Sequence, residues 1–134
     1  MICNAAIAVL VGILVVGAHA IVVPYDFTGH WTGTAQTPGK PVAMLSADLT
    51  IAAPLEFAGT LTAVTTEETF NCTVNGRQGR RVVMVAPCDN TGRFHFRGKL
   101  DPATETLSGK MIWKPPPSMH KRPKHGVFTL TKES

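Results

Sequence analysis

The sequence predicts an all-β protein, an eight-stranded antiparallel up-and-down barrel, and three observations lead to this prediction. Apolar and polar residues alternate along most of the chain, and no segment shows the 3.6-residue period of an amphipathic helix. Residues that favour turns separate eight such segments at hairpin-sized intervals. An apolar-x-Gly-x-apolar pattern also begins in Phe27-Thr28-Gly29-His30-Trp31-Thr32-Gly33-Thr34 and returns at 57–61, 96–100 and 107–111.

The recurring glycines favour a barrel over other β folds. Residues two apart in a strand share a face, so each copy of the pattern places two large apolar side chains and one glycine on the same side. Glycine inside a strand indicates sharp coiling or the close approach of another backbone. Inward glycines that repeat from strand to strand are typical of a small, tightly curved barrel. A two-sheet β-sandwich is the alternative way to protect the strand edges.

Residues 1–20 have the features of a secretory signal peptide. They carry no charged side chain, contain an apolar run from Ala5 to Val16, and end in the small-x-small sequence Ala18-His19-Ala20. The run is too short for a comfortable membrane span. An uncleaved anchor is the alternative, because no Lys or Arg follows Met1. The sequence therefore predicts a signal peptide, a single β-barrel domain over 21–134, and a secreted or periplasmic location.

The first half of the domain supplies four expected strands. Residues 21–26 form a short extended lead that we expect to lie across one end of the barrel. Strands are expected at 29–36, 43–52 and 55–64, and in a segment with Phe70, Cys72 and Val74 on one face. Their separators are rich in Pro, Gly and Thr. Asn75-Gly76 is a strong turn dipeptide and is expected to end the fourth strand.

The second half supplies four more strands. Residues 80–87 form an apolar run whose inward face is ambiguous, and 93–100 alternates Phe94 and Phe96 with bases. A strand at 107–114 follows, then a proline-rich basic segment at 115–125 and a last strand at 126–132. Eight is the number at which a meander closes into a barrel whose interior just fills or holds one small ligand.

Two cysteines remain after removal of the signal peptide, Cys72 and Cys88. An even number of cysteines in an exported chain favours a disulfide between them, and a pair of free buried thiols is the alternative. The chain has no Cys-x-x-Cys motif, which argues against redox catalysis.

The head of the first strand resembles a known superfamily. Gly29-x-Trp31, in an exported chain of eight strands, is similar to the start of the calycin-type barrels, the lipocalins and avidins. In that superfamily the tryptophan closes one barrel end and a basic residue near the last strand packs across it. The resemblance implies these roles for Trp31 and Lys132. The chain lacks a second lipocalin signature, a C-terminal helix and the polar lining of a biotin site, so the resemblance implies binding in the lumen but no particular ligand.

The interior of such a barrel is expected to be mainly apolar and to bind a small apolar ligand. Trp113 is expected in the lumen or at a barrel end. The residues expected to line the ligand site are Trp31, Leu49, Phe57, Leu61, Phe96 and Met111. The alternative function is an exported interaction protein, such as an inhibitor or envelope-associated adaptor, that uses its loops and a basic face over a filled core.

Catalytic residues, a metal site and a cofactor are not expected. His30 and His95 fall on outward positions of different strands, while His120 and His125 lie in the basic segment without carboxylates at ligand spacing. The sequence contains no Gly-x-Ser-x-Gly, His-Glu-x-x-His or phosphate-binding loop. The acids occupy outward positions or turns, where solvation makes them poor candidates for general acids or bases. These observations favour a non-enzymatic protein.

The charges are unevenly distributed along the chain. Five acids accompany only Lys40 between residues 26 and 68, whereas eleven bases accompany three acids between 77 and 124. The bases expected to face an anionic surface or acidic protein are Arg93, Arg97, Lys99, Lys110, Lys114, Lys121, Arg122 and Lys124. An ordinary solvated exterior is the alternative. Nucleic acid is not expected, because no exposed aromatic residues interleave these bases.

Overall fold

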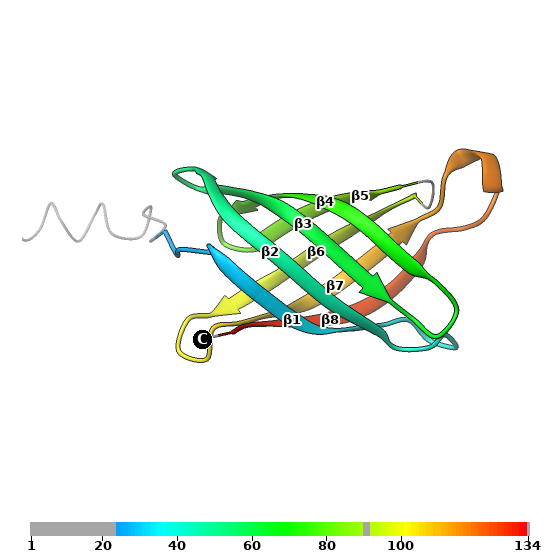
Figure 1. Ribbon diagram of the computed structural model, residues 1–134, viewed down its shortest axis with the longest axis horizontal. Coiled ribbons are helices and arrows are strands. Elements are labelled where there is room, and N and C mark those ends of the chain that lie inside the picture. Colours follow the sequence, from blue (N-terminus) through cyan, green and yellow to red (C-terminus); the bar gives the residue numbers. More distant parts are fainter. Residues whose placement is uncertain (1–23, 90–91, 134) are drawn as a thin grey trace, which may run out of the picture.

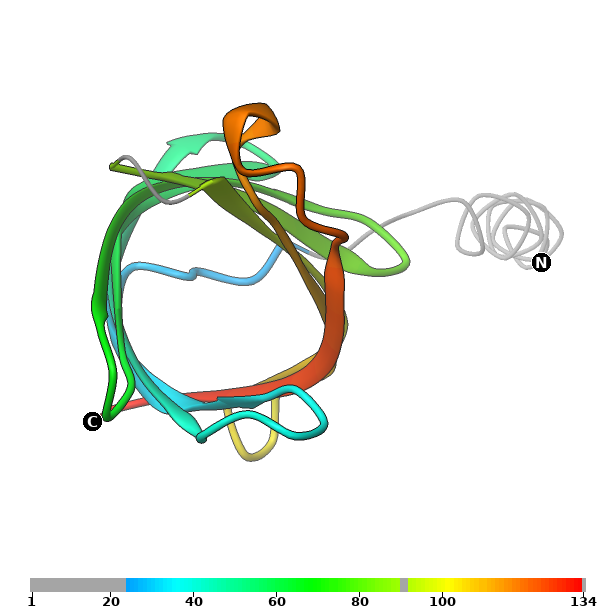
Figure 2. The same ribbon diagram turned by 90° about the vertical axis from the view of Figure 1, so that its right-hand side faces the viewer.

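A computed structural model describes residues 24–89 and 92–133, so the predicted signal peptide lies outside the described residues. In this part of the chain eight antiparallel strands form a closed barrel in sequence order, with the first strand hydrogen-bonded to the last (Figures 1 and 2). A one-turn 3-10 helix, η1, spans Pro117–Met119. The strands are β1 (Gly29–Gln36), β2 (Ala43–Ala53), β3 (Glu56–Val64), β4 (Thr69–Gln78), β5 (Val82–Cys88), β6 (Gly92–Asp101), β7 (Thr106–Lys114) and β8 (Lys124–Lys132). The predicted fold class is confirmed, and the sandwich alternative is wrong.

The inward glycines lie where neighbouring backbones come close. A Cβ atom added to Gly33 on β1 would lie 1.7 Å from the carbonyl oxygen of Thr129 on β8. A Cβ atom on Gly59 of β3 would lie 1.8 Å from the carbonyl oxygen of Asp48 on β2. Neither distance leaves room for a side chain, because ordinary contacts begin near 3.4 Å. The close backbone approach inferred from the sequence pattern is therefore present at these positions.

The predicted turn at Asn75-Gly76 is wrong. β4 continues to Gln78, and the chain turns at 79–81. Gly76 serves a packing role instead, because a Cβ atom there would lie 2.2 Å from Cζ of the Phe57 ring. The glycine makes space for a buried aromatic ring from β3 and does not need a positive φ angle.

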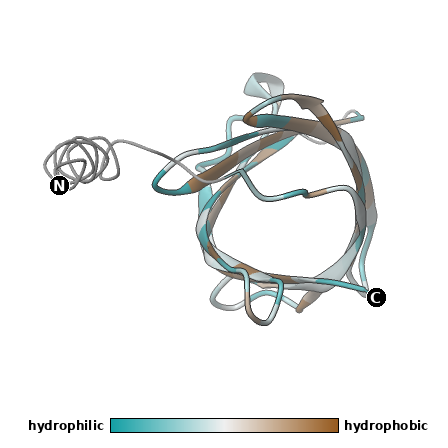
Figure 3. Ribbon diagram, turned by 90° about the vertical axis from the view of Figure 1, so that its left-hand side faces the viewer, coloured by the Kyte–Doolittle hydropathy of each residue, from teal (hydrophilic) through white to brown (hydrophobic). Residues whose placement is uncertain are grey.

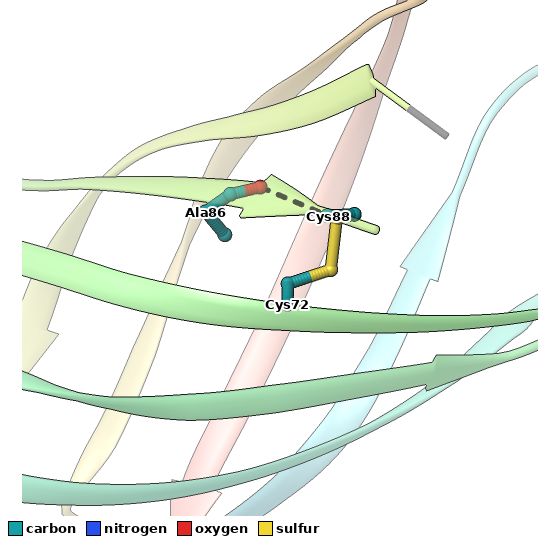
Figure 4. Close-up of a disulfide and its surroundings, with 3 residues drawn as sticks. All are labelled: Cys72, Ala86 and Cys88. Atoms are coloured by element: carbon teal, nitrogen blue, oxygen red, sulfur yellow. Dashed lines mark hydrogen bonds between the residues drawn. A yellow bond between two sulfur atoms is a disulfide. The ribbon is translucent and has the colours of Figure 1, made fainter. Parts of the chain in front are cut away.

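The longer strand sets the register that pairs the two cysteines. Cys72 on β4 lies directly opposite Cys88 on β5, and the two form a disulfide (Figure 4). A two-residue turn at Asn75-Gly76 would have placed Gly79, and not Cys88, opposite Cys72. The predicted pairing is confirmed, although it spans the turn at 79–81 and not the expected one.

The described part of the N-terminal lead, residues 24–28, crosses one end of the barrel, which we call the closed end (Figure 3). The backbone N–H of Tyr25 donates to Oε1 of Gln78 at 2.8 Å, and Nε2 of Gln78 donates to the Tyr25 carbonyl at 2.7 Å. Phe27 is fully buried and stacks on Phe57, with ring centroids 4.3 Å apart, and on Trp31 at 5.5 Å. The lead therefore fills this end of the lumen with aromatic rings.

Candidate functional site

A cavity of about 560 Å³ opens at the barrel end opposite the lead. The β1–β2 turn, the β3–β4 turn and the β7–β8 loop surround its mouth, and Figure 2 views this end. The volume lies within the range of small-molecule sites. We call this feature the open-end cavity.

Aromatic and small side chains shape the open-end cavity. Phe70 contacts Phe94 edge to face at a centroid distance of 5.4 Å and Trp113 at 6.4 Å. Because β4 and β7 are not neighbours in the sheet, the Phe70–Trp113 contact crosses the lumen. Ala35 and Ala43 are partners across β1 and β2, and both line the cavity. Their small side chains leave space above the aromatic floor.

The six expected ligand-lining residues are all buried, but they do not share one location. Met111 lines the open-end cavity. Trp31 and Phe57 pack against the lead at the closed end. Leu49, Leu61 and Phe96 are also core residues that do not line this cavity. The predicted alternation gave their inward orientation, but it carried no information about which end of the lumen is filled.

Sequence reasoning missed Phe70 and Phe94 as cavity residues. Both were expected on apolar faces of their strands, so the strand pattern contained a signal for their inward orientation. Their position at the open end follows from strand lengths and register, which decide how far each inward residue lies from either mouth. The expectation that Trp113 lies in the lumen or at an end agrees with its place in the cavity wall.

Charged residues of both signs surround the cavity mouth. Glu67 and Glu68 lie on the β3–β4 turn, and Lys40 lies on the β1–β2 turn. Lys121 and Arg122 on the β7–β8 loop and Lys124 at the start of β8 complete the charged rim. In a barrel of eight strands, the β3–β4 turn and the β7–β8 loop lie on opposite sides of the mouth. The rim is therefore acidic on one side and basic on the other.

The closed end holds the residues named by the calycin resemblance. Trp31 is fully buried, and its Nε1–H donates to the Phe27 carbonyl at 2.9 Å. Lys132 lies opposite Trp31 in the β1–β8 register. Its Nζ donates to the Asp26 carbonyl at 2.9 Å and lies 5.3 Å from the centroid of the Tyr25 ring. Lys132 thus packs across the lead that covers Trp31.

A hydrogen bond anchors the other edge of the lead. The Tyr25 hydroxyl donates to a carboxylate oxygen of Glu105, which follows β6. Burial raises the pKa of Tyr25, and the hydrogen bond to Glu105 raises it further. Tyr25 therefore stays protonated and holds this hydrogen bond at neutral pH. The closed end is fixed by side chains from both ends of the chain.

The outer face of β1 and β2 brings together three residues that the sequence did not connect. Nδ1 of His30 lies 2.8 Å from a carboxylate oxygen of Asp48, and its Nε2 lies 3.4 Å from the Ser46 hydroxyl. The order serine–histidine–aspartate is that of hydrolase triads. However, β2 is paired with strands on both sides, so the neighbouring amides are engaged in the sheet and supply no oxyanion site.

The hydrogen bond to Asp48 raises the pKa of His30, although partial desolvation opposes it. The cluster is thus an exposed, pH-sensitive polar contact. Within 24–89 and 92–133, no three or more His, Cys, Asp or Glu side chains lie together in an arrangement suited to a metal ion.

The basic face predicted from alternation lies on the outside of β6 and β7. Arg97 is opposite Lys110, and Arg93 is opposite Lys114, and all four are exposed. Facing pairs of like charge destabilise an antiparallel sheet. His95 lies between these pairs, and its pKa is lowered by burial and by the charges of Lys114 and Arg93.

The fold and the cavity define a class of protein: a closed eight-stranded antiparallel barrel with a cavity at the end opposite residues 24–28. Its fold is similar to a solved structure of EF1p2_mFAP2b bound to DFHBI, with a TM-score of 0.67 and 8% sequence identity. The match covers 79% of this chain and 93% of that chain. No protein-family model and no curated protein matches the sequence. Within the described residues, no helix has the length and apolar character to cross a membrane.

Proposed function

We propose that this protein is a non-enzymatic binding protein that holds a small, mainly apolar ligand in the open-end cavity. The observation that carries this proposal is a cavity of about 560 Å³ with an aromatic floor at the barrel end opposite residues 24–28. Small-molecule sites are mostly apolar concave spaces with a few polar groups at fixed positions. The rings of Phe70, Phe94 and Trp113 supply the apolar surface, and the charged rim supplies the polar groups.

The division of the lumen supports this function. At the closed end the rings of Phe27, Trp31 and Phe57 pack together in the interior. A second cavity, of about 460 Å³, lies at this end between residues 24–27 and the β4–β5 and β6–β7 turns. Facing alanines at 35 and 43 keep the other end open. EF1p2_mFAP2b, which has a similar fold, was solved with DFHBI bound, which supports the capacity of this architecture to hold a small molecule. Met111 contributes to the site directly, and the other expected lumen residues support it from the core.

The proposal includes export and a lipocalin-like mode of binding. The apolar segment before Ala20 and the disulfide between Cys72 and Cys88 support an oxidising, extracytoplasmic location. Gly29-x-Trp31 and the position of Lys132 support the calycin resemblance.

Binding of a fluorescent fatty-acid or retinoid probe tests the function. We expect saturable binding of one probe per chain. Ala43→Phe places a ring in the cavity and should weaken binding about tenfold or more, while leaving the barrel folded. Thr34→Phe is the matched control, because Thr34 is exposed on the outside of β1 opposite Met44. Absence of saturable binding to the wild-type chain, or equal binding by both variants, would refute a site in this cavity.

A second candidate function is an interaction protein that binds an anionic partner through the basic face. The facing pairs Arg97–Lys110 and Arg93–Lys114 favour it, because they place like charges together without a compensating acid between them. Reversal of Arg97 and Lys110 to glutamate should then abolish binding to an acidic partner at low salt. A wild-type chain that shows no salt-dependent binding to any anionic surface would leave these bases as an ordinary solvated exterior.

A further inference from the structure

The exposed apolar side chains are concentrated near the cavity mouth. Among the described residues, seven large hydrophobic side chains are exposed, and five of them lie on strand ends or loops at the open end. We call these five the apolar collar: Val42, Met44, Val64, Met119 and Val127. The other two, Ile51 and Val83, lie toward the closed end of β2 and β5.

The collar forms a row on the barrel exterior. Met44 on β2 faces Val64 on β3 and Thr34 on β1 in the strand register. Val127 on β8 faces Gln36, which lies on the same outer face of β1 as Thr34. The collar residues of β8, β2 and β3 therefore lie just below the mouth, with Thr34 and Gln36 of β1 between Val127 and Met44. Met119, on η1 in the β7–β8 loop, adds an apolar side chain beyond the strands.

Basic residues flank the same side of the mouth. Lys40 lies in the β1–β2 turn two residues before Val42, and Lys121 and Arg122 follow Met119 in the β7–β8 loop. Val127 is also opposite Lys110 across β7 and β8, so the apolar row continues directly into the basic face. The acids of the rim, Glu67 and Glu68, lie in the β3–β4 turn next to Val64, across the mouth from the β7–β8 loop. Apolar and cationic groups thus lie together over β7, the β7–β8 loop, β8, the β1–β2 turn and the start of β2.

We propose that the open end docks on the surface of an anionic phospholipid bilayer. The apolar collar lies at the level of the headgroups, and Lys40, Lys121 and Arg122 contact lipid phosphates. Interleaved apolar and basic groups bind membrane surfaces by combining buried apolar area with attraction to anionic lipids. The collar is made of separate Val and Met side chains, so the attachment is reversible. The side of the mouth that carries Glu67 and Glu68 tilts away from the lipid, and Val64 of the collar tilts away with it, so Val42, Met44, Met119 and Val127 make the apolar contact.

This docking places the cavity mouth against the phase in which apolar molecules dissolve. It goes beyond the proposed function and does not depend on it, since the collar and the rim bases are on the exterior. If the cavity holds an apolar ligand, docking gives that ligand a path that avoids bulk water. A bilayer also fits better than an acidic protein because the bases lie among exposed apolar side chains, which the headgroup region of a bilayer accommodates.

Co-sedimentation with vesicles tests the proposal. The exported chain is mixed with vesicles of equal parts phosphatidylcholine and phosphatidylglycerol, and with pure phosphatidylcholine vesicles as the neutral comparison. We expect binding to the anionic vesicles that weakens as salt is raised, because exposed charges are screened over about 10 Å at 0.1 M salt. All variants carry the same N terminus, so differences between them report on the substituted residues.

Two pairs of double variants locate the contact, each a test variant with its comparison. Met119→Ser with Val127→Ser should weaken vesicle binding about tenfold or more. Ile51→Ser with Val83→Ser is the control away from the mouth, and it should bind like the wild type; these two side chains are each 43% exposed, against 44% for Met119 and 59% for Val127. Lys121→Glu with Arg122→Glu should also weaken binding about tenfold or more, and Arg97→Glu with Lys110→Glu should have a smaller effect.

The outcomes separate the docking from ligand binding. Met119 and Val127 do not line the cavity, so their serine variant should bind a soluble fluorescent probe like the wild type in the absence of vesicles. If the wild-type chain binds vesicles but does not bind the fluorescent probe, docking is supported and the proposed function is refuted. Equal vesicle binding by the collar variant and its control would refute docking, as would salt-independent binding. If charge reversal at Arg97 and Lys110 weakens vesicle binding more than charge reversal at Lys121 and Arg122, the contact lies on the side of the barrel and the proposal is overturned.

Discussion

Substitution of Gly33 by alanine tests the physical basis of the barrel. Gly33 lies on β1 opposite Leu130 of β8, at the seam where the first and last strands close the sheet. Its Cβ atom would lie 1.7 Å from the Thr129 carbonyl oxygen and 2.9 Å from Cα of Leu130. Both atoms belong to backbone, so no rotation of a side chain can relieve the contact. The strands at the seam must separate locally to accept the methyl group.

The magnitude follows from what that separation disrupts. Forcing a methyl group into a packed interior costs roughly 1–3 kcal/mol. Displacement of β8 also weakens one or two ladder hydrogen bonds, each worth about 1 kcal/mol in net stability. We therefore expect Gly33→Ala to lower the free energy of unfolding by about 3 kcal/mol. For a domain of this size, that corresponds to a drop in Tm of roughly 10–20 °C.

Chemical denaturation monitored by circular dichroism measures this loss, with the disulfide kept oxidised in all samples. Gly79→Ala is the matched control, because a Cβ atom there meets only the Arg81 carbonyl oxygen at 3.6 Å, an ordinary contact. Gly79 also has no positive φ angle, so alanine should change stability by less than about 1 kcal/mol. Equal midpoints for the two variants would show that β1 and β8 are not in close backbone contact and would refute the reasoning.

Two further predictions concern the disulfide and the His30 contact. Replacing Cys72 and Cys88 with serine should lower the free energy of unfolding by about 3 kcal/mol in the chain-entropy model, because the bond spans a sequence separation of 16 residues; an unchanged denaturation midpoint, or two free thiols in the denatured, unreduced wild type, contradicts this. NMR titration should show the pKa of His30 above its ordinary value, and Asp48→Asn should lower it. Since the folded-state pKa is raised, the contact adds stability below the unfolded-state pKa and loses it as pH rises through the folded-state value. Asp48→Asn should therefore cost more stability at about pH 5 than at about pH 8, and the reverse order would exclude the His30–Asp48 contact.

The sequence determined the fold class and most strand positions. Alternating segments and inward glycines depend on local chemistry, because side chains two apart share a face and a missing Cβ marks close backbone approach. The pattern around Gly33 and Gly59 therefore led to a closed barrel, and both positions show such an approach. The outward direction of Arg97 and Lys99 followed from the inward direction of Phe96 in the same way. The even cysteine count gave the disulfide.

Tertiary structure decided how these elements meet. Asn75-Gly76 has the local chemistry of a turn, yet the Phe57 ring occupies the space beside Gly76 and the strand continues. The contact between His30, Asp48 and Ser46 depends on the β1–β2 register, which no single segment contains. The sequence also could not predict which end of the lumen is open. Trp31 and Met111 have the same inward pattern, but Trp31 lies beside the lead and Met111 lines the cavity. Which inward side chains fill the barrel and which line a cavity depends on strand lengths, register and the path of residues 24–28 across one end, and these exist only when all eight strands are assembled.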